Sequence, residues 1–383
     1  MTPPPLAGGG WGEGSATALP DPGTARVEPP CQHFGTCGGC VLQHWRDDAY
    51  IAWKTDLLRT ALRRGGYADA VIAAAVRTGP GERRRMDLAA RRVGGRIVLG
   101  VHRLRSAEVV DLAECHVLHP LLAALIAPLR ALLSRLRAFR REGSVIANLL
   151  DSGPDMLLRT DAALHLDDRI ALTEFARALA LPRIAWAKNS DEPEPVAILR
   201  PPSTMLSGVN ITPPPGAFLQ ASPSGEAAII TAVVDAIPAN GRIAELFAGC
   251  GAITFALARR TRVNAWEGDP ASVSALRAAA NHAGLSSRVT VTQRDLARQP
   301  LQAKELAGFA SLVLDPPFAG AAAQVTQIAT SHVPSVIYVS CNPATLARDA
   351  RMLSQAGYRL TAATPIDQFL WSARLESVCV FNR

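Results

Sequence analysis

The second half of the chain alternates between short apolar runs and stretches with helical spacing. The apolar runs cover residues 242–247, 262–267, 289–293, 311–314 and 335–340. Helical stretches such as 271–284 and 343–357 lie between them. Such alternation predicts a parallel β-sheet with helices on both of its faces.

The last two apolar runs, 359–365 and 375–381, have no helical stretch between them. They predict an antiparallel pair at one edge of the sheet. A Rossmann-like parallel sheet that closes with an antiparallel hairpin resembles the Class I S-adenosylmethionine-dependent methyltransferases. We therefore expect an α/β catalytic domain of this class over residues 209–383.

The first half of the chain is less regular. Helical spacing at 45–64 and 118–140 flanks alternating stretches between 83 and 112, which predict a small antiparallel sheet. Residues 1–30 are rich in Pro, Gly and Ala and predict a disordered tail. We thus expect an α+β central domain over residues 31–208, between the tail and the catalytic domain.

The amino-acid composition limits the cellular compartment and the binding partners that can be expected. The chain has 40 Lys and Arg against 33 Asp and Glu, a net charge of +7 that is only weak evidence for a nucleic-acid partner. No apolar run is long enough to span a membrane, and no secretion signal is recognisable, so a cytoplasmic protein is expected. In a reducing cytoplasm, clusters among the seven cysteines indicate a metal site or catalysis more often than disulfides.

A glycine-containing loop and three acidic residues indicate a ligand site. Gly249 and Gly251 lie between the first apolar run and its helix, where they let the backbone turn sharply beside a ligand. Glu267, Asp295 and Asp315 follow the ends of the next three runs. Open α/β sheets bind ligands at these carboxyl ends of their strands. Glu267 is suited to accept the ribose hydroxyls of an adenosine, and Asp295 to meet its adenine amino group.

Cys341 follows the fifth apolar run, in the sequence Ser340-Cys341-Asn342-Pro343. A cysteine at the end of a strand is often only a small buried apolar residue. Here Pro343 can begin the next helix, which puts the thiol beside a helix N-terminus, where a thiolate is stabilised. The lowered thiol pKa expected from this position favours a nucleophile.

These motifs resemble the RNA uracil-C5 methyltransferases that act on ribosomal and transfer RNA. The resemblance extends from Cys31 onward and is carried by Phe218-Leu219-Gln220, residues 245–251, Glu267, Asp315-Pro316-Pro317, residues 340–343 and Leu375-Glu376-Ser377-Val378. It implies S-adenosylmethionine as the methyl donor, held by Gln220, Phe247, Glu267 and Asp315.

The resemblance also implies two catalytic residues. Cys341 is expected to add to C6 of a uracil, which makes C5 nucleophilic, and Glu376 to remove the C5 proton after methyl transfer. Burial of Glu376 beside an apolar base should raise the pKa of its carboxyl group. The target base must leave any stack to reach such a pocket.

Four cysteines form a second candidate site. Cys31, Cys37 and Cys40 lie close together, and Cys115 follows 74 residues after the last of them. Four thiolates can hold either a tetrahedral zinc ion or a [4Fe–4S] cluster, and their spacing alone does not decide between the two. The resemblance implies a [4Fe–4S] cluster, as in the ribosomal RNA members of the family, and so favours ribosomal over transfer RNA as the substrate.

The sequence departs from the family at three places. Phe318 stands where the family usually has Arg, and Ala252 where Asn is frequent. The roughly 30 residues before Cys31 are too few for the N-terminal RNA-binding barrel of some members, so either the basic central domain of a monomer makes the RNA contacts or the true start of the protein lies upstream.

Two alternatives remain open. Asp-Pro-Pro-Phe is the signature of enzymes that methylate exocyclic amino groups of bases; in that reaction Phe318 would stack on the base and Asp315 would accept the amino hydrogens. That chemistry has no use for Cys341 or Glu376. The other alternative is a non-catalytic iron–sulfur RNA-binding protein with a vestigial methyltransferase fold.

Overall fold

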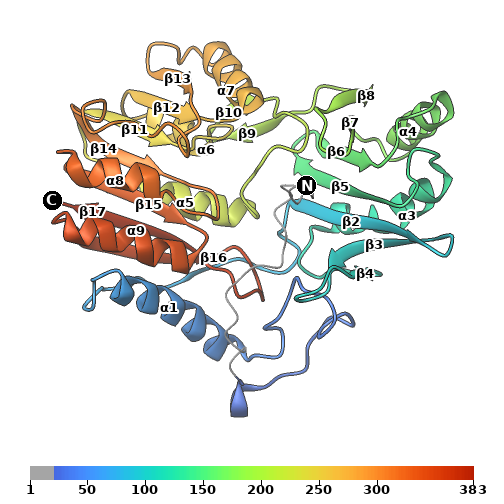
Figure 1. The fold of residues 1–383 in the computed structure, drawn as a ribbon, viewed down its shortest axis with the longest axis horizontal. Coiled ribbons are helices and arrows are strands. Elements are labelled where there is room, and N and C mark those ends of the chain that lie inside the picture. The colour runs from blue at the N-terminus through green and yellow to red at the C-terminus, as the bar shows by residue number, and fades with distance from the viewer. Residues whose placement is uncertain (1–20) are drawn as a thin grey trace.

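Two β-sheets organise the chain in the computed structural model, which describes residues 21–383 (Figure 1). The larger sheet has eight strands in the order β1 (Val76–Arg77), β16 (Arg359–Asp367), β17 (Glu376–Asn382), β15 (Ser335–Ser340), β14 (Phe309–Leu314), β11 (Arg242–Leu246), β12 (Val263–Glu267) and β13 (Val289–Gln293). Strands β11 to β15 run parallel to their neighbours among themselves, whereas β17 is antiparallel to both β15 and β16. The predicted sheet and its antiparallel closing pair are confirmed.

Helices cover both faces of the larger sheet because its strands carry apolar residues on both sides. One face packs against α1 (Asp47–Arg64), α8 (Ala322–Thr330) and α9 (Pro343–Gln355). The other packs against α5 (Pro223–Ala236), α6 (Ala252–Ala258) and α7 (Pro270–His282). This three-layer arrangement is that of the Class I methyltransferases.

The smaller sheet has seven strands and helices on one face. Its order is β4 (Val109–Asp111), β3 (Arg96–His102), β2 (Arg85–Val93), β5 (Glu142–Leu150), β6 (Gly153–Thr160), β7 (Arg183–Lys188) and β8 (Glu194–Ile198). The helices that cover it are α2 (Pro120–Ala123), α3 (Ile126–Arg135) and α4 (Leu166–Ala178). The single helix predicted at 118–140 is thus two helices, and the second ends where Leu136 adopts an extended backbone.

The structure divides the chain differently from the boundaries expected at residues 31–208 and 209–383. Helix α1 packs against α9, and β1 pairs in parallel with β16 at the edge of the larger sheet (Figure 1). Residues 47–77 therefore pack with the larger sheet, although the whole smaller sheet, from β2 to β8, separates them from its other strands in the chain. A hairpin of β9 (Thr204–Leu206) and β10 (Val209–Ile211) lies between the two parts of the sequence.

Only part of the expected tail is described. Residues 1–20 lie outside the described residues, and 21–30 pack onto the chain that follows them. There the Val27 N–H donates to the His44 carbonyl at 2.9 Å, and the Arg46 N–H to the Ala25 carbonyl at 2.7 Å. Among the helices of residues 21–383, none combines the length and apolar character needed to cross a membrane.

The two sheets meet at the segment that carries Gln220. Arg84 Nε donates to the Gln220 carbonyl at 3.0 Å, and its guanidinium pairs with buried Glu226 at 2.5 Å. Arg85 Nη1 and Asn148 Nδ2 both donate to the Ala217 carbonyl, at 2.7 and 2.8 Å. The smaller sheet therefore fixes the backbone on one side of the candidate active site.

Candidate active site

The loop after β11 turns sharply towards the carboxyl edge of the sheet. Phe247, Gly249 and Gly251 all have positive φ values, of 65°, 53° and 95°. A Cβ on Gly251 would collide with the Leu276 side chain, so that position needs glycine. The half-buried Phe247 packs against the apolar layer beneath the loop.

Glu267 joins this loop to the next one. Its carboxylate accepts the Gly249 N–H at 2.8 Å and the N–H groups of Gly268 and Asp269 at 2.7 and 2.8 Å. Asp295 lies just beyond β13 and caps the following turn by accepting the Ala297 N–H at 3.0 Å. Both acids lie at the carboxyl ends of their strands, as the sequence predicts.

Asp315 belongs to a chain of hydrogen-bonded side chains that links four segments. Gln220 Nε2 donates to Asp315 Oδ2 at 2.9 Å. Gln368 Nε2 donates to both Gln220 Oε1 and Glu376 Oε2, at 2.8 and 2.7 Å. The Ala221 N–H donates to Gln368 Oε1 at 3.0 Å, which fixes the orientation of the Gln368 amide and, through it, that of Gln220.

This chain of amides determines which oxygen of Glu376 is available for chemistry. Oε2 accepts from Gln368, whereas Oε1 is buried and has no hydrogen-bond partner in the described residues. Burial and the negative charge of Asp315 raise the pKa of Glu376 well above its usual value, the direction expected from the sequence. Burial also raises the pKa of Asp315 to about 7, although Gln220 opposes the shift.

Cys341 and Glu376 lie at the same end of two neighbouring antiparallel strands. Ser340, the last residue of β15, is paired with Ser377 of β17. Cys341 follows β15 directly and Glu376 is the first residue of β17, and the charge of Glu376 acts on the thiol. After Cys341, Asn342 begins α9 by accepting the Ala344 N–H at 3.0 Å, and Pro343 is its first residue.

The expected lowering of the Cys341 pKa is not what the structure shows. Burial and, after it, the charges of Glu376 and Asp315 raise the thiol pKa to about 12, whereas Arg374 opposes the shift. The N-terminus of α9 would lower the thiol pKa, but burial and two acids raise it by more. Only the folded chain brings these acids close to Cys341.

Three residues at this site were not predicted. Gln368, which connects Gln220 with Glu376, lies on the loop after β16, where no sequence motif marks it. Arg374 lies on the same loop, and its guanidinium is 4.9 Å from the centre of the Phe318 ring. Glu245 is buried behind the glycine loop, where burial raises the pKa of its carboxyl group to about 8. Its place in the motif between 245 and 251 was the only available signal.

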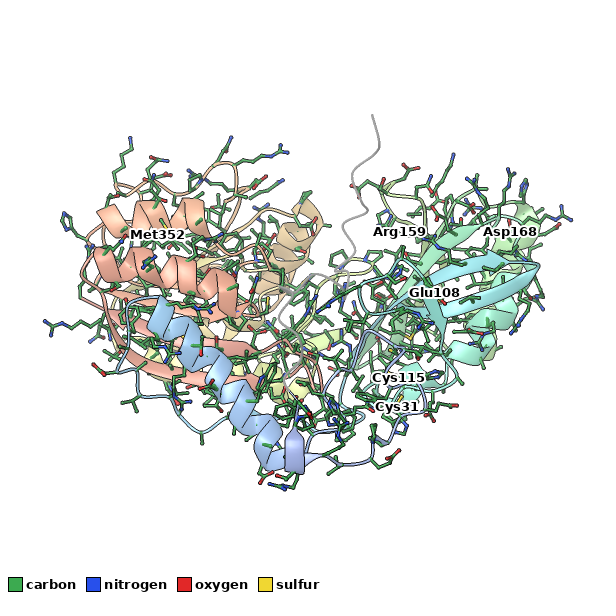
Figure 2. All side chains as sticks on the ribbon, turned by 60° about the horizontal axis from the view of Figure 1, so that its bottom comes forward. Cys31, Glu108, Cys115, Arg159, Asp168 and Met352 are labelled. Carbon is green, nitrogen blue, oxygen red and sulfur yellow. The ribbon has the colours of Figure 1, made fainter. Side chains whose placement is uncertain are left out.

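Of the four cysteines of the second candidate site, Cys31 and Cys115 are seen near one another in Figure 2. A cavity of about 60 Å³ is lined in part by Cys37, Cys40 and Cys115. Burial and, after it, the neighbouring thiols, Cys31 among them, raise the pKa of these three thiols, that of Cys40 to about 12. Backbone N–H groups are already directed at the sulfurs: that of Gly39 donates to Cys37 Sγ at 3.4 Å.

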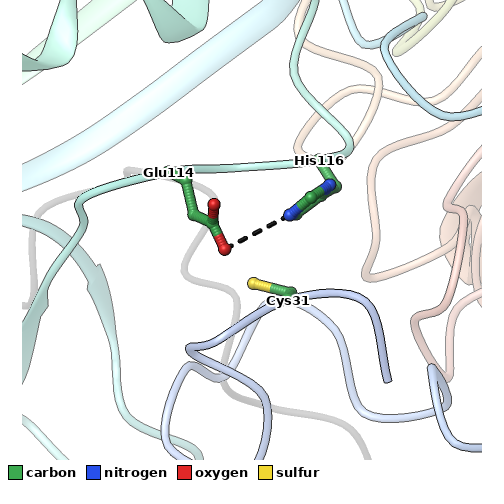
Figure 3. Close-up of side chains that lie close together, drawn as sticks. All are labelled: Cys31, Glu114 and His116. Atoms are coloured by element: carbon green, nitrogen blue, oxygen red, sulfur yellow. Dashed lines mark ion pairs between the residues drawn. The ribbon is translucent and has the colours of Figure 1, made fainter. Parts of the chain in front are cut away.

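Cys31 also lies beside two other possible ligands, as Figure 3 shows. Its sulfur, a Glu114 oxygen and a His116 nitrogen all lie within 4.8 Å of one another. Glu114 is already engaged, because it accepts the Gln32 N–H at 3.1 Å and pairs with His116 at 3.2 Å. These two residues flank Cys115 and hold the loop that carries it against residues 31–32.

Comparisons with known proteins agree with this geometry. The family model for tRNA (Uracil-5-)-methyltransferase matches residues 214–383. An uncharacterized RNA methyltransferase of Mesorhizobium japonicum is 40% identical over 94% of this chain and 85% of its own. The 23S rRNA (uracil(1939)-C(5))-methyltransferase RlmD of Edwardsiella ictaluri is 36% identical over 97% of this chain and 85% of its own.

A solved structure shows the same fold. The tRNA (uracil-54, C5)-methyltransferase of Pyrococcus abyssi, in complex with S-adenosyl-L-homocysteine, aligns with a TM-score of 0.68 over 90% of this chain and 85% of its own, at 20% identity. The fold is therefore that of an S-adenosylmethionine-dependent methyltransferase. With relatives of this identity and coverage, the chain belongs to the RNA uracil-C5 methyltransferase family.

Proposed function

We propose that this protein transfers a methyl group from S-adenosylmethionine to C5 of one uridine in 23S ribosomal RNA. Cys341 is the nucleophile and Glu376 the base. The observation that carries the proposal is the pairing of Ser340 with Ser377, because it brings Cys341 to the end of the strand pair where Glu376 lies, with its Oε1 buried and without a hydrogen-bond partner in the described residues.

The residues at the strand ends fit the methyl donor. Glu267 offers a carboxylate to the ribose hydroxyls, Asp295 lies where an adenine amino group can be met, and Gln220 and Asp315 face the reacting end. Phe247 and Gly249 form the turn on which the donor would rest. The buried Glu245 Oε2, which has no hydrogen-bond partner in the described residues, lies behind this turn. S-adenosylmethionine supplies an electrophilic methyl group and leaves as a neutral thioether.

The side chains of the protein account for the remaining steps. The Cys341 thiolate forms a bond to C6, and the C5=C6 electron pair moves onto C5 and O4, so that C5 can accept the methyl group. Glu376 Oε1 then takes the C5 proton. The electrons of that C–H bond restore the C5=C6 double bond, the C6–S bond breaks, and the thiolate is regenerated. A raised pKa suits Glu376 to hold the proton it receives.

The ribosomal target is tested in the cell. We expect 23S ribosomal RNA from a strain without this gene to lack one 5-methyluridine, which mass spectrometry of RNA fragments would locate. The wild-type gene should restore it, and a gene with Cys341→Ala should not. Loss of a methyluridine from transfer RNA instead would contradict the ribosomal target, and restoration by the Cys341→Ala gene would contradict the mechanism.

Cys31, Cys37, Cys40 and Cys115 are proposed to hold a [4Fe–4S] cluster. Three of the thiols line one cavity, the charge of Cys31 acts on each of them, and backbone N–H groups are directed at sulfur, which is a ligand set for such a cluster. The charge of Arg83 acts on Cys115 and Cys40, which suits the net negative charge of a cluster with four thiolates. The cluster would tie Cys115 to the chain before α1 and so brace the RNA-binding part of a cytoplasmic protein.

Metal analysis of anaerobically purified protein tests this site. We expect about four iron and four sulfide ions per chain, and loss of both in Cys37→Ser. The buried Cys379, which lies in the larger sheet outside the cluster, provides the matched control, since Cys379→Ser should keep the iron. Zinc in place of iron would show that the four thiols form a structural zinc site instead.

A further inference from the structure

Phe318 is held beside the nucleophile by its main chain. The Asn342 side chain, which follows Cys341 directly, donates from Nδ2 to the Phe318 carbonyl at 3.0 Å. The ring remains 36% exposed, which would suit stacking on a base. One face of the ring is nevertheless covered, because the Arg374 guanidinium carbon lies 4.9 Å from the ring centre.

Hydrogen bonds hold the backbone of Arg374 on both sides of its Cα atom. Its N–H donates to Ser372 Oγ at 3.1 Å, and its carbonyl accepts a hydrogen bond from Lys54, a lysine that is fully buried. It precedes Glu376 by two residues and lies on the loop that leads into β17. The Phe318 ring comes from the loop after β14, whose main chain is hydrogen-bonded to the residue after the nucleophile. The stacked pair therefore joins the two segments that neighbour Cys341 and Glu376.

The charges around Cys341 explain what this pair can do. Glu376 from β17 and Asp315 from the end of β14 are acids, and both favour the neutral thiol, as burial does. The positive charge of Arg374 lowers the pKa of Cys341, and the cysteine in turn raises the pKa of Arg374. Arg83 is the other cation whose charge interacts with Arg374. A thiolate in this setting requires a positive charge to offset two acids.

We propose that Arg374 is a positioning residue that stabilises the Cys341 thiolate, and that the Phe318 ring holds its guanidinium in place. This inference rests on the proposed role of Cys341 as the nucleophile. It also assigns Phe318 a role in C5 methylation of uracil, that of holding the guanidinium of Arg374. The ring face that the guanidinium covers is closed to a base, so only the other face of Phe318 is left for the stacking that amino-group methylation would need.

The test is the rate at which iodoacetamide alkylates Cys341 across the alkaline pH range, followed by mass spectrometry of the peptide that contains it. Only the thiolate reacts, so the rate reports its fraction at each pH. We expect Arg374→Gln to slow alkylation at a given pH by about tenfold, the effect of one pKa unit. Arg374→Lys keeps the charge and should recover part of this rate. Phe318→Leu should give a loss between those of the two arginine variants.

A second stacked arginine provides the matched control. The Arg242 guanidinium also lies 4.9 Å from a phenylalanine ring, that of Phe309, at the opposite end of the sheet from Cys341. Arg242→Gln should leave the alkylation profile of Cys341 unchanged. A profile that Arg374→Gln also leaves unchanged would overturn the inference. If that variant does not fold, equal profiles for Phe318→Leu and the wild type overturn it instead.

Methylation of 23S ribosomal RNA by Cys341→Ala, measured in parallel, keeps the two proposals apart. Activity in that variant would contradict the role of Cys341 and so the proposed function. Loss of activity in Cys341→Ala together with an unchanged alkylation profile in Arg374→Gln would contradict the role of Arg374 alone.

Discussion

Replacing Glu376 by Gln should stop the reaction after methyl transfer and leave the RNA covalently attached to the protein. The C5 proton then has no acceptor, so the C6–S bond to Cys341 cannot break by elimination. General bases contribute about 10²–10⁴-fold to a rate, and turnover should fall by that order. The glutamine preserves the hydrogen bond from Gln368, which now reaches an amide oxygen, so the local geometry is retained.

The adduct should migrate as a band of reduced mobility on a denaturing gel and disappear after nuclease treatment. Two variants serve as controls for it. Cys341→Ala combined with Glu376→Gln should give no such band, because the bond to C6 cannot form. Gln368→Leu removes the donor to Glu376 Oε2 and to Gln220 Oε1 but leaves the carboxyl group in place, so it should slow turnover less than Glu376→Gln. Normal turnover by Glu376→Gln would show that another group removes the proton.

The second large effect is expected at Lys54, a lysine whose side chain is completely buried. It pairs with the equally buried Asp367 at 2.7 Å and donates to the Phe369 carbonyl at 3.1 Å and to that of Arg374. Tyr50 OH donates to the other oxygen of Asp367 at 2.7 Å. Lys54→Met would leave a buried carboxylate without its cation, and such losses reduce the free energy of unfolding by about 3–5 kcal/mol.

Urea denaturation of the variants would measure this change. Arg59→Met on the same helix is the matched control, since it breaks an ion pair with Asp56 at 3.0 Å that is more than half exposed. Exposed pairs contribute about 0–1 kcal/mol, so this variant should unfold near the wild-type urea concentration. Equal midpoints for Lys54→Met and Arg59→Met would show that the Lys54–Asp367 pair does not hold α1 to the sheet.

The parts of the structure that could be predicted from the sequence are those that depend on residues close together in the chain. Runs such as 335–340 are buried on both faces, and their apolar residues identify parallel strands without knowledge of the neighbours. The places of Glu267 and Asp315 were predicted as well, because residues that follow parallel strands lie at the carboxyl edge of the sheet. The pair of Cys341 and Glu376 came from the family resemblance, and the register of β15 and β17 supports it.

What the sequence did not predict depends on contacts between distant segments. Gln368 matters because its amide meets Gln220, 148 residues earlier in the chain. Strand β1 has only two residues, too few for a pattern of alternation to mark it. The rise in the Cys341 pKa comes from burial and from acids on other strands, which outweigh the local helix N-terminus from which the opposite shift was predicted.

The docking of α1 onto α9 has a consequence during synthesis. Leu58 and Leu62 of α1 pack into the core beside the last helix, and β1 pairs with the last strand but one. A ribosome adds about 5–20 residues per second, so α1 leaves it roughly 15 to 60 seconds before its binding surface is complete. During that time the apolar face of α1 is uncovered in the nascent chain, and chaperones can bind to it. A chain that terminates before α9 would never cover it, and such fragments should be prone to aggregation and proteolysis.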